Sequence, residues 1–98
     1  MSYIGYAREN VDRLIEAALT AEETDRTQIL DTDYGSLEVA ELAGQYTVFR
    51  DGYSLDDRTE NCGVVINDND TDEDIAKKFR TILMRVDKYN KSRQKIAA

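Results

Sequence analysis

Histidine and tryptophan are both absent from this 98-residue chain. The absence of histidine removes the side chain that most often serves as a general base near neutral pH. It also excludes catalytic arrangements of the Ser-His-Asp and Cys-His kinds. The five glycines are scattered, so no glycine-rich phosphate loop is present. A pair of carboxylates is the catalytic device that remains. No spacing singles out such a pair, and we expect a protein that is not an enzyme.

Cysteine is nearly absent as well, since Cys62 is the only one. One cysteine cannot form an internal disulfide or hold a structural zinc ion, and it is typical of a reducing compartment, so we expect a cytoplasmic protein. The stretch MSYIGYAREN lacks the apolar centre of a secretory signal, and the apolar runs are too short to cross a bilayer. The sequence therefore predicts no membrane association and no cofactor.

Charge is plentiful and unevenly distributed. The formal net charge is −7, with 20 acidic and 13 basic residues. Residues 1–74 contain nineteen acids and five arginines, a net −14, whereas residues 75–98 contain eight Lys or Arg and one acid, a net +7. Opposite charges on separate parts of a small protein attract different partners, or other copies of the same chain.

The apolar pattern predicts a helix at each end of the chain and strands between them. The first helix is expected from about Ser2, its N-cap, to Glu23. A second helix begins at Thr71, which forms a near capping box with Asp74. The apolar face of that helix consists of Ile75, Phe79, Ile82, Leu83, Val86 and Tyr89.

The middle of the chain is predicted to be β structure. The clearest strand is Gln45–Arg50, and weaker ones are Thr27–Leu30 and Cys62–Ile66. The last of these has little alternation, which indicates a central or doubly covered strand. Residues 33–36 and Asp51-Gly52 are turn signals, the second leading into a return strand over Tyr53–Leu55. Residues 36–44 suit a strand or a short helix.

Together these elements predict one α+β domain over residues 1–98. Its small antiparallel sheet of three to four strands is covered by an N-terminal and a C-terminal helix.

An acidic stretch, NDNDTDED over residues 67–74, leads into the last helix. Asp68-x-Asp70-x-Asp72 resembles the start of a calcium loop. Glu73 and Phe79 stand where that loop requires glycine and glutamate, so we expect no metal. Acids after Thr71 suit the positive end of a helix, but this does not explain Asp68 and Asp70. In an extended segment the alternate acids would form a row with a spacing of about 6.6–7 Å.

Such a row is the basis of a hypothesis about function. Duplex DNA is also a regular array of negative charge, and a protein that displays one can block the basic groove of a DNA-binding protein. In size, composition and helix–strands–helix order, the chain is similar to inhibitors of the anti-restriction and anti-CRISPR type made by phages and mobile elements. That resemblance implies an acidic, DNA-mimicking inhibitor whose partner is the basic surface of a nucleic-acid-handling protein.

The candidate contact residues follow from the acidic segments and from turn tyrosines, which suit interfaces. The acidic candidates are Asp68, Asp70, Asp72, Glu73, Asp74, Glu9, Asp12, Glu16, Asp56 and Asp57. The aromatic candidates are Tyr34 and Tyr53. Glu9, Asp12 and Glu16 share one arc of the predicted first helix with Glu23.

Two alternatives use the basic part of the chain. In the first, the last helix binds nucleic acid directly through a ridge opposite its apolar face. The residues of that ridge are Lys77, Arg80, Lys88, Lys91 and Lys95. In the second, the acidic body of one copy meets the basic helix of another in a homo-oligomer.

Overall fold

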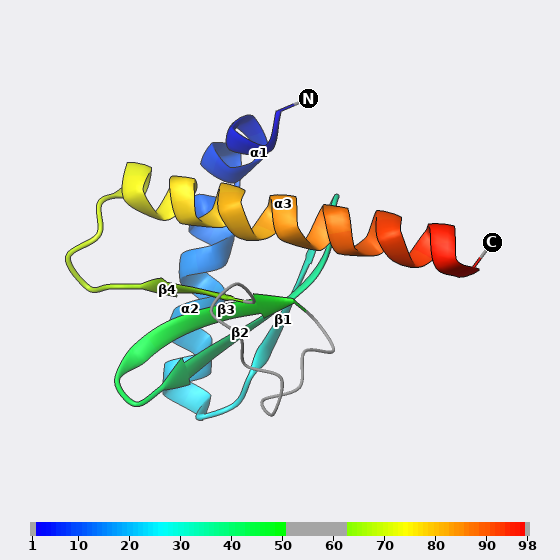
Figure 1. Ribbon diagram of the computed structural model, residues 1–98. Coiled ribbons are helices and arrows are strands. Elements are labelled where there is room, and N and C mark those ends of the chain that lie inside the picture. Colours follow the sequence, from blue (N-terminus) through cyan, green and yellow to red (C-terminus); the bar gives the residue numbers. More distant parts are fainter. Residues whose placement is uncertain (1, 51–62, 98) are drawn as a thin grey trace.

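The computed structural model describes residues 2–50 and 63–97 (Figure 1). Within them the chain forms three helices and a four-stranded antiparallel sheet, which confirms the predicted α+β class. In chain order the elements are α1 (Tyr3–Glu9), α2 (Val11–Thr24), β1 (Gln28–Thr32), β2 (Gly35–Leu42), β3 (Gln45–Arg50), β4 (Gly63–Ile66) and α3 (Asp72–Ala97).

The sheet is a simple meander with the strand order β1-β2-β3-β4. Its register pairs Leu30 with Leu37 and Val39 with Val48, so these apolar side chains share one face. All four are buried in the hydrophobic core. The opposite face carries Ile29, whose partner across the ladder is Glu38, and Ile29 is 55% exposed.

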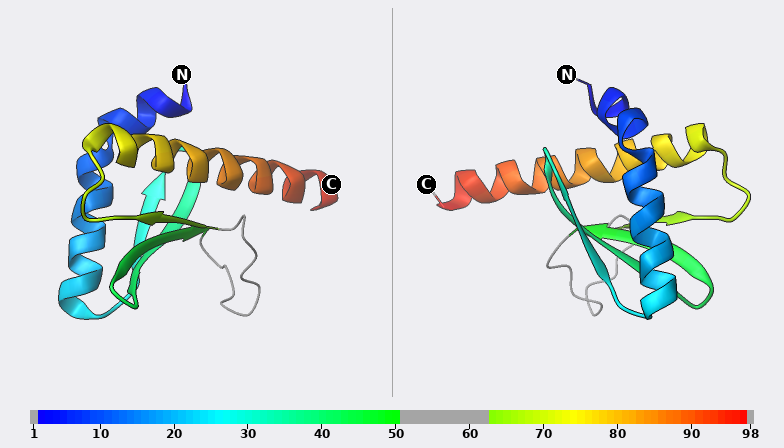
Figure 2. Two further views of the ribbon diagram at one scale, coloured as in Figure 1. Left: turned by 60° about the vertical axis from the view of Figure 1, so that its left-hand side comes forward. Right: turned by 180° about the vertical axis from the view of Figure 1, so that it is seen from behind.

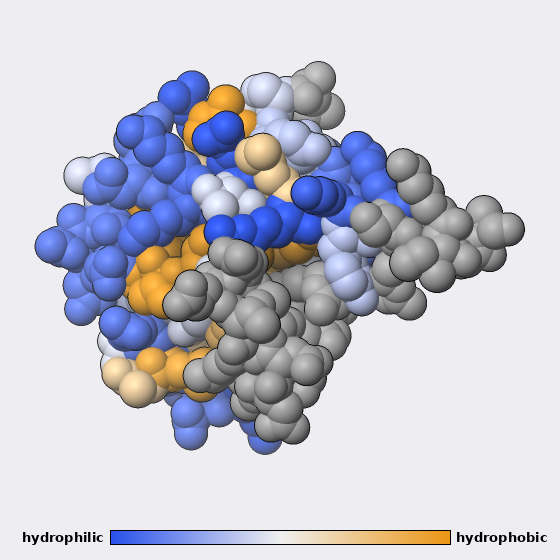
Figure 3. Space-filling view, viewed as in Figure 1, coloured by the Kyte–Doolittle hydropathy of each residue, from blue (hydrophilic) through white to orange (hydrophobic). Residues whose placement is uncertain are grey.

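Both long helices pack on the same face of the sheet. α2 runs beside β1 and β2, and α3 crosses over the other end of the sheet (Figure 2). The other, open face carries no helix among the described residues. Figure 3 shows hydrophobic surface over β4 on that face. The helices contribute these residues to the core: Tyr6 and Ala7 from α1, Val11, Leu14 and Ala18 from α2, and Ile75, Ala76, Phe79, Ile82, Leu83 and Val86 from α3.

The N-terminal helix differs from the expectation, because it is two helices that meet at Asn10. The Asn10 side chain donates to the Tyr6 carbonyl, and the residue has φ −117° and ψ 12°, outside the helical range. Tyr6 and Ala7 are buried on α1, which packs against α3, whereas α2 packs on the sheet. Because of the break, the apolar residues of α1 pack against α3 and those of α2 pack on the sheet. The predicted Ser2 cap is confirmed, since its hydroxyl accepts from the Gly5 N–H.

The structure assigns residues 36–44 and changes the expected position of the last strand. Residues 36–44 belong mostly to β2, whose turn to β3 has positive φ at Ala43 and Gly44. The prediction that the last strand is central was wrong. β4 is an edge strand of the sheet that the described residues form, and Val65 is 36% exposed. The strand shows no alternation of apolar and polar residues because both of its faces carry apolar side chains: Ile66 lies in the core and Val65 lies on the open face. The Asp51-Gly52 turn, the Tyr53–Leu55 strand and Cys62 lie outside the described residues.

The start of α3 forms the predicted capping box. The Asp74 N–H donates to the Thr71 hydroxyl at 3.2 Å, and the Thr71 N–H donates to the Asp74 carboxylate at 3.1 Å. Each side chain thus satisfies a backbone donor that the first turn of a helix leaves free.

Replacing the cap should weaken the whole fold, because α3 supplies most of the helical core. We expect Thr71→Ala to lower the free energy of unfolding by about 1 kcal/mol. The matched control is Thr81→Ala in the same helix, where the hydroxyl donates to the Lys77 carbonyl. Alanine is the better helix former there, so no loss is expected. Urea denaturation followed by circular dichroism measures both. Equal stability of the two variants would contradict this role for Thr71.

Candidate partner-binding groove

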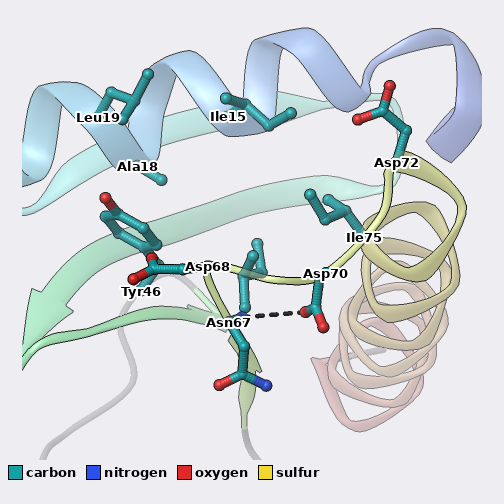
Figure 4. Close-up of a pocket in the computed structure, with 10 residues that line it drawn as sticks. Ile15, Ala18, Leu19, Tyr46, Asn67, Asp68, Asp70, Asp72 and Ile75 are labelled. Atoms are coloured by element: carbon teal, nitrogen blue, oxygen red, sulfur yellow. Dashed lines mark hydrogen bonds between the residues drawn. The ribbon is translucent and has the colours of Figure 1, made fainter.

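A groove with an apolar floor and an acidic rim lies where α2, β3, β4 and the start of α3 meet (Figure 4). Its volume is about 310 Å³. We call it the acidic groove. Its apolar residues are Ile15, Ala18, Leu19, Tyr46, Ile66 and Ile75, and its polar residues are Asn67, Asp68, Asp70 and Asp72.

Helix periodicity explains the α2 wall of the groove. Ile15 and Leu19 are four residues apart and therefore neighbours on the helix surface. Leu19 is 53% exposed, which is unusual for a leucine beside a core. Ala18 lies between them and is buried. Its small side chain leaves the space that a larger residue would fill.

The acidic rim comes from a tight turn after β4. The Asp70 N–H donates to the Asn67 carbonyl, and the Asn67 N–H donates to the Asp70 carboxylate, each at 3.0 Å. The segment is therefore folded back and not extended, which corrects the expected row of evenly spaced acids. Asn67 and Asp70 hydrogen-bond the backbone locally, as these residue types do in turns, and this overrides an extended conformation.

Asp70 is held by a second partner in α3. Lys78 donates to its carboxylate, and the Asp70 and Lys78 side chains are only 13% and 31% exposed. The Lys78 hydrogen bond, then that from the Asn67 N–H, keep the pKa of Asp70 below its usual range. The charge of Asp70 is thus compensated within the chain, and Asp70 has a structural role in the rim.

Asp68 and Asp72 are different. Both are exposed, and neither forms a hydrogen bond or ion pair within the described residues. They are the two rim carboxylates that remain available for a partner.

Tyr46 lines the groove and lies near three carboxylates. Its hydroxyl donates to Glu22 on α2 at 2.6 Å. That hydrogen bond, burial and the charges of Glu22, Asp68 and Glu41 raise the pKa of Tyr46 to about 12. Because the nearby carboxylates oppose formation of the phenolate, the same field favours a cationic group in this place.

A second hollow of about 340 Å³ adjoins the groove, and Asp72 lines both. Asp12 from α2 and Glu73 from α3 line this second hollow. Arg8 forms an ion pair with Glu73 at 2.7 Å and lowers the pKa of that carboxyl. The fold thus brings Asp12 close to acids some sixty positions later in the sequence, and Asp12 has no ion-pair partner among the described residues.

The remaining acidic candidates lie apart from these hollows or outside the described residues. Glu9 is exposed on α1, separate from the α2 arc that holds Asp12, and Glu16 is exposed on α2. Asp74 is exposed and serves the capping box. Asp56, Asp57 and Tyr53 lie outside the described residues.

Tyr34 takes part in packing. Its ring lies 4.8 Å from that of Tyr3 and 5.5 Å from that of Tyr6, measured between centroids. Its carbonyl accepts from Asn90 of α3. The position beside a turn, which suggested an interface residue, here joins the first hairpin to α1 and α3.

The residues of the predicted basic ridge lie on α3, and the structure describes most of their side chains. Lys77, Arg80 and Lys88 are exposed on α3, whereas Lys91 pairs with Asp87 at 3.1 Å. Lys95 belongs to α3, and its side chain lies outside the description. Exposed Met84, which the ridge prediction omitted, lies between Arg80 and Lys88 along the helix.

Comparison with known proteins adds no relative. No family model, curated protein or solved structure matches this chain. Within residues 2–50 and 63–97, no group of three or more acids or cysteines is placed to hold a metal ion. No helix in that part of the chain is long and apolar enough to span a membrane.

The apolar floor is the part of the site that the acidic pattern does not reveal. Ile75 was predicted only as part of the apolar face of the last helix. The available signal was Leu19, a large apolar residue placed beside the core face of its helix.

The lowered pKa of Asp70 makes a prediction about acid stability. A carboxyl whose pKa is lower in the folded state stabilises the fold above its unfolded pKa, near 3.9. That contribution disappears as pH falls through the lower folded value. We therefore expect Asp70→Asn to lose less stability than the wild type between about pH 5 and pH 2.

Lys78→Gln, which removes the largest cause of the shift, should flatten the curve in the same way. Lys88→Gln is the matched control and should leave it unchanged. Urea denaturation at a series of pH values provides the comparison. Parallel curves for the wild type and Asp70→Asn would show that Asp70 is not coupled to folding.

Proposed function

We propose that this protein is an inhibitor that binds a basic protein surface in its acidic groove and so keeps nucleic acid from that surface. The observation that carries the proposal is the combination at one place of an apolar floor with two exposed acids, Asp68 and Asp72, that have no ion-pair partner among the described residues. Interfaces commonly have this composition, an apolar centre within a polar rim.

The chemistry of the groove defines the partner. The exposed carboxylates of Asp68 and Asp72 attract cations and repel nucleic acid. The exposed Leu19 requires an apolar side chain opposite it. A complementary segment therefore presents an apolar anchor flanked by Lys or Arg. Clustered basic residues are the electrostatic signature of nucleic-acid-binding proteins, which are the class of partner that we propose.

The acids of the groove do not reproduce the regular charge spacing of the DNA backbone. The turn at residues 67–70 removes the regular spacing, and Lys78 compensates Asp70. What supports competition with nucleic acid is the net −14 of residues 1–74, which steers a basic partner toward the groove. The apolar floor then supplies contact area that a nucleic acid does not offer. Inhibitors of the anti-restriction and anti-CRISPR kind are the functional class that this arrangement suits.

The test is displacement of DNA from basic partners. Purified restriction enzymes, CRISPR nucleases and other nucleic-acid-binding proteins are each loaded with fluorescent duplex DNA. The wild-type protein is then added, and release is followed by anisotropy. We expect release from at least one class of protein, and a loss of at least tenfold in potency for the Asp68→Lys, Asp72→Lys double variant. Tenfold corresponds to about 1.4 kcal/mol.

A second double variant controls for overall charge. Glu9→Lys with Asp33→Lys changes the net charge equally at exposed positions outside the groove, and it should retain most of the potency. Circular dichroism confirms the fold of both. If no class of protein releases its DNA, or if the groove variant releases it as well as the wild type, the proposal is wrong.

A further inference from the structure

The outer surface of α3 has the chemistry that the acidic groove requires of a partner. Met84 is 40% exposed, and Lys77, Arg80 and Lys88 are exposed on the same side of the helix. At 100° per residue these four side chains fall within an arc of about 80°. We call them the basic stripe. The basic stripe has an apolar residue, Met84, flanked by cations. The acidic groove has an apolar floor flanked by acids, so the two surfaces are complementary.

The cations of the stripe form no ion pair within the described part of the chain, and Lys77 acts only at longer range, helping to lower the pKa of Glu73. Arg8, Lys78 and Lys91 have ion-pair partners there, whereas Lys77, Arg80 and Lys88 have none. In a chain with 20 acids, unpaired cations around an exposed methionine are a feature to be explained. Methionine is adaptable and is enriched at interfaces.

The stripe cannot enter the groove of its own chain. The first turns of α3 form part of the groove wall through Asp72 and Ile75. Met84 lies nine residues after Ile75 in the same helix, which is about 13.5 Å along the helix axis. The stripe also faces away from the buried side of α3, which carries Phe79 and Leu83. Only a second molecule can bring a stripe to this groove.

We infer that, in the free protein, the acidic groove binds the basic stripe of a second copy. This inference rests on the groove of the proposed function and names a further occupant for it. Met84 of one copy contacts the apolar floor beside Leu19, and the cations of the stripe lie against Asp68 and Asp72 of the other. The net charge of −7 makes two copies repel, but the separation into −14 and +7 parts allows attraction in this orientation.

The arrangement has a regulatory consequence. The same groove cannot hold a second copy and a foreign basic surface, so a target must displace the second copy. Self-association therefore keeps the apolar floor covered until a target with higher affinity is present.

Charge exchange between two variants tests the inference. The groove variant is Asp68→Lys with Asp72→Lys, and the stripe variant is Lys77→Glu with Arg80→Glu and Lys88→Glu. Sedimentation velocity gives the mass of each alone and of their mixture, at about 0.02 M and about 0.5 M salt, where screening differs several-fold. We expect the wild type to associate at low salt and to dissociate at high salt, each variant alone to be monomeric, and the mixture to associate again.

Recovery in the mixture also shows that both variants are folded, since their reversed charges complement each other. A wild type that is monomeric at low salt overturns the inference. So does either variant that associates as well as the wild type, or a mixture that stays monomeric. If the stripe variant instead loses binding of labelled duplex DNA while the wild type is monomeric, the stripe is a nucleic-acid surface.

The DNA-displacement assay separates this inference from the proposed function. The stripe variant has an intact groove, so it should displace DNA from a target at least as well as the wild type. If self-association fails and displacement succeeds, only the inference falls. If self-association succeeds and no target loses its DNA, the proposed inhibition falls and the groove serves assembly.

Discussion

The connection between β4 and α3 is the constraint on which the rest of the structure depends. Between Asn67 and Lys78, the Asp70 carboxylate accepts from the Asn67 N–H and from Lys78, and Thr71 and Asp74 form the capping box. These contacts fix where α3 leaves the edge of the sheet, and hence how its apolar side meets the core. They also set the positions of Asp68 and Asp72. The same short segment thus establishes the fold and the rim of the groove.

The distribution of ion pairs separates structural charges from available ones. Arg8 with Glu73, Lys78 with Asp70, and Lys91 with Asp87 tie α3 to α1, to the turn and to itself. Asp87 also accepts from Tyr3 of α1. Beyond these pairs, the exposed charged residues without an ion-pair partner in the described part of the chain include Asp68 and Asp72 at the groove, and Lys77, Arg80 and Lys88 along the outer side of α3. Asp72 lies in the first turn of α3, where an acid suits the positive end of the helix, whereas Asp68 precedes the helix.

The sequence predicts the elements better than the site. The strand Gln45–Arg50 and the capping box at Thr71 were found because propensity, periodicity and cap chemistry agree there. The break at Asn10 was missed because the apolar periodicity continues across it, while the Asn10 side chain bonds the Tyr6 carbonyl and α1 packs on α3. The predicted row of evenly spaced acids was wrong because that prediction assumed an extended chain at Asp68 and Asp70, where the structure has a turn. The groove itself needs α2, β3 and α3 together, and only the acids of its rim were found from the sequence.

The central claim is that the acidic groove is the binding face, and photo-crosslinking tests it most directly. Leu19 in the groove and Ile29 on the open face of the sheet are 53% and 55% exposed, so they form a matched pair of sites. p-Benzoylphenylalanine is introduced at one position or the other in cells that make the protein. We predict adducts to a basic, nucleic-acid-binding protein from position 19, lost with Asp68→Lys and Asp72→Lys, and none from position 29. Adducts from position 29 with none from position 19 would contradict the account.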